Sequence, residues 1–145
     1  RRHSLLVEGG DKAAEAELQR ARAAGVAIVG LDEPSYPRLL REIFDPPAVL
    51  YVKGGLVAEE GRLSVALVGA RAATPSAASF ARALAADLAR AGLSVVSGFA
   101  RGVDTAAHLG ALQAEGRTVA GLGSGLARVH PPGTDWLTAV MPALS

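Results

Sequence analysis

The sequence contains no cysteine and few aromatic residues. Without cysteine, the 145-residue chain can form neither disulfides nor thiolate sites for zinc or iron–sulfur clusters. Aromatic residues make up 4% of the chain and hydrophobic residues 50%, so the core must be built mainly from Ala, Val and Leu. The 3 histidines are far apart in sequence, which argues against a metal site. No apolar run approaches the roughly 18 residues of a membrane span, so we expect no membrane association.

Charge is divided unevenly along the chain, although the net charge is only +1. Residues 1–61 carry 8 basic and 10 acidic side chains, a net −2, whereas residues 62–145 carry 7 and 4, a net +3. All the basic side chains of the second part are arginines, and a guanidinium can contact a phosphate through two N–H groups. A GC-rich genome also favours arginine, so position must decide which arginines serve a ligand.

Residues 1–61 are predicted to form an N-terminal lead-in segment that packs on the main domain. Apolar residues at helical spacing predict a helix over 11–24. Two short strands are predicted at 26–29 and 49–52, with a turn or helix over 34–44 between them.

Residues 62–145 are predicted to form the main domain, after a Gly- and Glu-rich connector at 53–62. Its predicted elements alternate, with strands at 63–68, 93–96 and 118–122, helices at 76–91 and 103–115, and the start of another helix at 134–140. Alternating strands and helices of this length predict an α/β fold with a right-handed, doubly wound parallel sheet. Three strands make a small sheet and the chain does not begin with Met. We therefore expect part of a larger fold, truncated at the C-terminus and with its natural start upstream.

A glycine-rich turn follows each predicted strand. The carboxyl ends of parallel strands meet at one edge of a sheet, where ligands bind. Glycines let backbone amides approach an anion, and helix N-termini add positive potential. Such turns also need glycine for folding alone, but two of these carry an arginine. The predicted phosphate-binding rim consists of Gly69, Arg71, Thr74, Ser97, Gly98, Arg101, Gly102, Gly123, Ser124 and Gly125.

The turns do not match the common nucleotide-binding motifs. A dinucleotide site would need Gly-x-Gly-x-x-Gly after the first strand and an acidic residue after the second, but Gly69 stands alone and Ser97 takes the second place. No Gly-Lys-Ser/Thr follows any strand, which excludes a P-loop. A nucleic-acid backbone or a mononucleotide remains, and no cofactor is expected.

Asp104 and His108 are the only candidates for an acid–base pair. They lie four residues apart on a predicted helix, and no third catalytic partner is visible. We favour a structural role, with an intrahelical hydrogen bond between them and with the Asp104 carboxylate accepting amides at the helix start. That carboxylate is expected to hold the turn at 97–102 in place. No catalytic residue and no metal ligand is predicted.

Five stretches resemble the DNA-processing protein A (DprA/Smf) family over about residues 26–140. They are Tyr36-Pro37-Arg38-Leu39-Leu40, Pro46-Pro47-Ala48-Val49-Leu50-Tyr51-Val52-Lys53-Gly54, Val68-Gly69-Ala70-Arg71, Val96-Ser97-Gly98-Phe99-Ala100-Arg101-Gly102-Val103-Asp104-Thr105-Ala106-Ala107-His108 and Gly116-Arg117-Thr118-Val119-Ala120-Gly121-Leu122-Gly123-Ser124-Gly125. The run from Ser97 to His108 is the most specific.

The resemblance implies an extended Rossmann-like domain that binds single-stranded DNA and has no catalytic activity. It implies a cytoplasmic protein of natural transformation and recombination, which protects incoming strands, helps load the recombinase RecA and works as a homodimer. The family's pocket arginine corresponds to Arg71. The chain departs from the family at Pro75-Ser76, where Tyr-Gly is usual, and at His130-Pro131, where Tyr-Pro is usual.

Two other interpretations compete with this one. A related Rossmann-type enzyme, a nucleoside-monophosphate phosphoribohydrolase, would carry Pro-Gly-Gly-x-Gly-Thr-x-x-Glu, but the nearest run is Pro131-Pro132-Gly133-Thr134 with no Glu after it. The third interpretation is a structural scaffold whose turns bind nothing.

Overall fold

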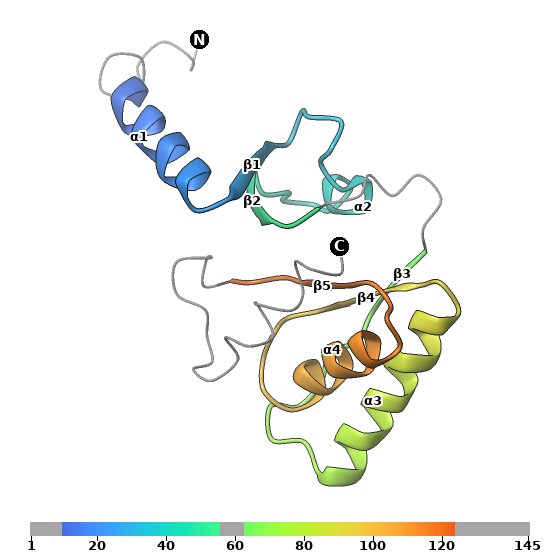
Figure 1. Cartoon of the computed structure of the whole chain (residues 1–145). Coiled ribbons are helices and arrows are strands. Elements are labelled where there is room, and N and C mark those ends of the chain that lie inside the picture. Colours follow the sequence, from blue (N-terminus) through green and yellow to red (C-terminus); the bar gives the residue numbers. More distant parts are fainter. Residues whose placement is uncertain (1–9, 56–62, 124–145) are drawn as a thin grey trace. The chain divides into compact units, whose positions relative to one another are not determined.

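The computed structural model describes residues 10–55 and 63–123 (Figure 1). The chain divides into two units, Arg1–Lys53 and Gly54–Ser145, and the division falls at the start of the predicted connector. The packing of the lead-in segment on the main domain stays a prediction. The predicted helix at 134–140 lies outside the described residues.

The first unit contains a helix and a β-hairpin. It runs through α1 (Gly10–Ala23), β1 (Val26–Gly30), α2 (Arg38–Arg41) and β2 (Val49–Lys53). The two strands pair antiparallel, from Val26 opposite Lys53 to Gly30 opposite Val49, so both predicted strands are confirmed. Tyr36 lies between the two strands in sequence and is 3% exposed. Its hydroxyl donates to the carbonyl of Pro47 at 2.8 Å and so fixes the segment that connects β1 to β2.

The predicted turn or helix over 34–44 is mostly turn. Glu33 and Tyr36 each donate their amide to the carbonyl three residues earlier, so this part of the chain forms tight turns. A four-residue helix, α2, forms only after Pro37, whose carbonyl accepts the amide of Arg41. Proline is well suited to the position before a first helical turn but cannot continue a helix.

The second unit is built on a parallel sheet. Its strands are β3 (Ser64–Ala66), β4 (Ser94–Ser97) and β5 (Thr118–Ala120), in the spatial order β3-β4-β5. Val65 lies opposite Val95, and Val96 opposite Val119. The helices α3 (Pro75–Arg90) and α4 (Val103–Gln113) connect the strands and lie together on one side of the sheet (Figure 1). This arrangement confirms the predicted Rossmann-like α/β fold.

The core of this unit is aliphatic, as the composition predicts. It consists of Ala85, Ala89, Val95, Ala107 and Ala111, with Leu67, Leu88 and Ala114 packed against it. Small side chains let the helices approach closely. At Gly110 a Cβ atom would lie 2.0 Å from the carbonyl oxygen of Arg82, so only glycine fits where α4 crosses α3.

Local signals set the limits of α3. Thr74 is its N-cap, and its hydroxyl oxygen accepts the amide of Ala77 at 3.2 Å. Pro75 takes the first helical position, where its missing N–H costs nothing. After the last turn, Gly92 adopts a left-handed φ of +84°.

None of the described helices is both long and apolar enough to cross a membrane.

Candidate nucleic-acid interface

The loops that follow β3 and β4 touch through their backbones. Gly102 has a φ of +78°, and a Cβ there would lie 2.2 Å from the carbonyl oxygen of Ala70 and 2.7 Å from that of Arg71. The amide of Val103 donates to the same Ala70 carbonyl at 3.3 Å. Residues far apart in sequence therefore meet at the carboxyl edge of the sheet, as the alternating pattern predicts.

A buried carboxylate joins these two loops. Asp104 lies in the first turn of α4 and is 5% exposed. Its Oδ1 accepts the amide of Gly69, and its Oδ2 accepts the amide of Ala100, both at 3.3 Å. The prediction that Asp104 accepts backbone amides is confirmed. Because the amide of Gly69 already donates to Asp104, this glycine holds the two loops together, and its amide is not available to a phosphate.

The two arginines of these loops face solvent. Arg71 and Arg101 are both exposed, and neither forms an ion pair with an acidic side chain of residues 10–55 or 63–123. Guanidinium groups without an acidic partner are available to an anion. The structure thus brings together the segments that carry the two predicted charged contacts.

Ser97 and Thr74 both use their hydroxyl groups within the fold. Ser97 is buried, and its hydroxyl donates to the carbonyl of Leu67 at 2.6 Å, which ties β4 to the end of β3. Thr74 is exposed and caps α3, and its hydroxyl lies 3.2 Å from that of Ser76. A direct contact of either side chain with a phosphate stays a prediction.

The third turn is described only at its start. The amide of Gly121 donates to the carbonyl of Ser97 at 2.9 Å, so this turn leaves the sheet beside the second one. Gly123 is exposed at the end of the described part, and Ser124 and Gly125 lie outside it.

The predicted hydrogen bond between Asp104 and His108 is wrong. Both Asp104 oxygens accept backbone amides, and His108 Nδ1 instead lies 2.8 Å from the hydroxyl of Thr118 on β5. His108 is fully buried, and this burial lowers its pKa from 6.5 to about 4, with the charge of Asp104 opposing the shift. The sequence gives no sign of the Thr118 contact, because helix spacing shows only neighbours on the same helix.

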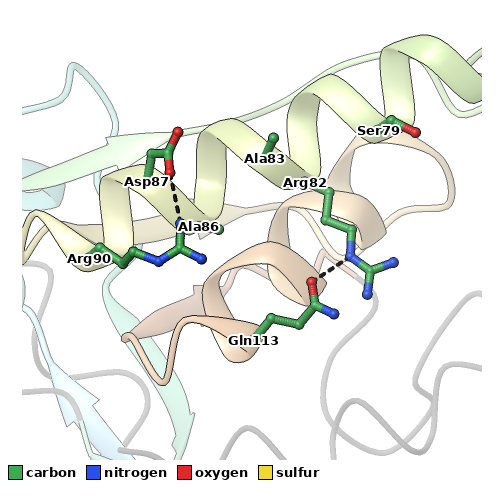
Figure 2. Close-up of a pocket in the computed structure, with 7 residues that line it drawn as sticks. All are labelled: Ser79, Arg82, Ala83, Ala86, Asp87, Arg90 and Gln113. Atoms are coloured by element: carbon green, nitrogen blue, oxygen red, sulfur yellow. Dashed lines mark hydrogen bonds and ion pairs between the residues drawn. The ribbon is translucent and has the colours of Figure 1, made fainter.

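A separate shallow groove of about 350 Å³ lies on the outer surface of α3 and α4 (Figure 2). Its polar side chains largely pair with one another. Arg82 donates to Gln113 at 2.8 Å, and Arg90 pairs with Asp87 at 2.8 Å. The groove contains none of the predicted rim residues, and its two arginines already donate to Gln113 and Asp87.

The described residues also offer no metal site. No group of three or more His, Asp or Glu side chains comes together within the part of the chain that the structure describes.

Comparison with protein families points to recombination. The family model described as DNA recombination-mediator protein A matches residues 27–142. Protein Smf of Synechocystis sp. is 43% identical over 104 residues, which cover 70% of this chain and 26% of that protein.

Solved structures of two bacterial proteins share the fold. DNA processing protein A from Streptococcus pneumoniae matches with a TM-score of 0.76 and 33% identity, over 88% of this chain and 44% of that one. DNA processing protein A from Helicobacter pylori, studied for its unique single-stranded DNA binding mode, matches with a TM-score of 0.68 and 29% identity, over 79% of this chain and 51% of that one. The chain thus spans between a quarter and about half of the length of these relatives.

Proposed function

The chain belongs to the DNA recombination-mediator protein A family, and from this we propose that it binds single-stranded DNA at the rim formed by the loops 69–74 and 98–102. The loop that begins at 121 would extend the same rim. Arg71 and Arg101 supply the charged contacts to backbone phosphates.

The observation that carries this proposal is the backbone contact at Gly102. Because Gly102 packs against the carbonyls of Ala70 and Arg71, the two arginines extend from touching segments and can contact one strand together. The Asp104 carboxylate is buried and accepts two backbone amides, so it is not itself in contact with a strand bound at the surface.

The amides of the second loop support an anion site. Ala100 turns its amide inward to Asp104, whereas the amides of Gly98, Arg101 and Gly102 donate to no acceptor among residues 10–55 and 63–123. Backbone amides without an acceptor in the protein can bind an anion, and they do so without reading a base. Binding should therefore depend strongly on salt and little on DNA sequence.

We also propose that the chain acts without catalysis. The acid–base pair that an enzyme could use is occupied: Asp104 accepts two amides, and His108 is fully buried and bonded to Thr118. A general acid or base must reach its substrate directly or through one water.

The chain spans only part of the length of its relatives, so the activity of a whole protein of this family is a proposal. We propose that it protects incoming single strands in the cytoplasm during natural transformation, helps load RecA on them, and acts as a homodimer.

Competition between ligands tests the binding proposal. Fluorescence anisotropy with labelled oligo(dT) should show binding that unlabelled oligonucleotide displaces. Nucleoside monophosphates at the same phosphate concentration should displace it far less, because they offer one phosphate instead of a row. Displacement by a monophosphate at low concentration, with its hydrolysis to a free base, would instead support the phosphoribohydrolase interpretation.

A further inference from the structure

Phe99 has a backbone conformation that a bulky residue rarely adopts. Its φ is +63°, and its side chain is 1% exposed. A non-glycine residue stays in this left-handed region only where its surroundings hold it there. Phe99 lies between Gly98 and Ala100, so whatever holds it also sets the path of the loop that carries Arg101.

The ring that packs against Phe99 is that of His108 on α4. The two ring centroids are 5.6 Å apart, and the ring planes are tilted by 53°. His108 is fully buried, and this burial lowers its pKa, while the charge of Asp104 opposes the shift. The loop is therefore supported from below by a neutral aromatic ring.

The hydrogen bonds of Thr118 fix the orientation and the tautomer of that ring. The Thr118 hydroxyl donates its single proton to the carbonyl of Val95 at 2.9 Å. Its oxygen can then only accept from His108 Nδ1, so the proton of the imidazole is on Nδ1. His108 Nε2 is buried and has no hydrogen-bond partner among the described residues. The ring thus has one directional anchor, on β5, and its contact with Phe99.

We propose that His108 is a positioning residue for single-stranded DNA binding. Anchored to Thr118, its ring holds Phe99 in the left-handed conformation. The amides on the two sides of Phe99 differ as a result. The amide of Ala100 donates to Asp104, whereas the amide of Gly98 donates to no acceptor in the described part of the chain. The loop is thereby fixed in the form that presents Arg101. This inference rests on the proposed function.

The test compares DNA affinity with stability in variants of the 145-residue chain. Oligo(dT) affinity is measured by anisotropy at a temperature where circular dichroism shows each variant to be folded. His108→Ala should weaken binding about tenfold, roughly the loss of one charge-assisted contact, and should lower the salt dependence of affinity. The matched control is Val95→Ala, which removes buried methyl groups from the core of the same unit but keeps the backbone carbonyl to which Thr118 donates. It should destabilise the fold and keep the wild-type affinity.

A double variant tests whether His108 acts through Phe99. If both residues act by fixing one loop, their effects on affinity should not add. The double variant Phe99→Ala, His108→Ala should then have the same oligo(dT) affinity as whichever single variant binds more weakly. If His108→Ala does not fold, Thr118→Val takes its place, because it removes the hydroxyl to which the ring is bonded. The same loss of affinity and of salt dependence is then expected for Thr118→Val.

The outcomes separate this inference from the proposed function. Wild-type affinity in His108→Ala, or an equal loss in Val95→Ala, overturns the role of His108 and leaves single-stranded DNA binding in place. Failure of the wild-type chain to bind oligo(dT) overturns both.

Discussion

Gly102 lies so close to Ala70 that only glycine fits at position 102, because a Cβ there would lie 2.2 Å from the Ala70 carbonyl oxygen. The φ of +78° at Gly102 adds a second requirement for glycine. These two constraints act at the point where both arginine-bearing loops meet.

Gly102→Ala is therefore expected to push the two loops apart. The fold should lose about 1–3 kcal/mol of stability, and oligo(dT) affinity should fall even where the variant is folded. Urea unfolding and anisotropy measure the two effects. Gly92→Ala is a useful comparison, because Gly92 also has a positive φ, of +84°, but no atom of the described residues lies within 4 Å of a Cβ at that position. Equal behaviour of the two variants would contradict a special role for the Gly102 contact.

Asp104 offers a test of how the loops are held together. Asp104→Asn leaves one acceptor oxygen in place of two and turns an NH₂ group toward a backbone amide. We expect a loss of about 1–3 kcal/mol in the free energy of unfolding, since a buried amide is left without an acceptor. Hydrogen exchange should become faster at the amides of Gly69 and Ala100. Unchanged exchange rates at both amides would show that their hydrogen bonds to Asp104 do not hold the loops together.

The pKa of His108 predicts how stability depends on pH. Burial lowers this pKa to about 4 in the folded chain from 6.5, so between these values the unfolded chain binds a proton that the folded chain does not. Stability should therefore fall as the pH is lowered from 6.5 toward 4, by about 2 kcal/mol at pH 5 relative to pH 7.

Urea unfolding at both pH values measures this loss, and His108→Gln provides the comparison. The variant keeps every other titrating group, so the difference between the two proteins isolates His108. If wild type and variant lose stability in parallel between pH 7 and pH 5, the low pKa of His108 is wrong.

Much of the second unit could be predicted from its sequence. The apolar run before Gly69 and the glycines that end each helix are local signals, and the strands and helices follow from them. The convergence of the loops could be predicted too, because parallel strands direct their carboxyl ends to one edge.

The details of the site depend on contacts between residues far apart in the chain. Asp104 reaches Gly69 across 35 positions, and His108 bonds to Thr118 on a neighbouring strand rather than to Asp104 on its own helix. The left-handed conformation of Phe99 was also beyond prediction, because in sequence Phe99 is an ordinary apolar residue in a turn.

The central claim is that Arg71 and Arg101 contact the phosphates of one DNA strand. The direct measurement is the slope of the logarithm of oligo(dT) affinity against the logarithm of salt concentration, for wild type, Arg71→Ala, Arg101→Ala and the double variant. Each arginine removed should lower the magnitude of the slope by about 0.7, and the double variant by about twice that. Arg82→Ala, in the outer groove of α3 and α4, should keep the wild-type slope. Wild-type slopes in both Arg71→Ala and Arg101→Ala, with the fold intact, would contradict the account.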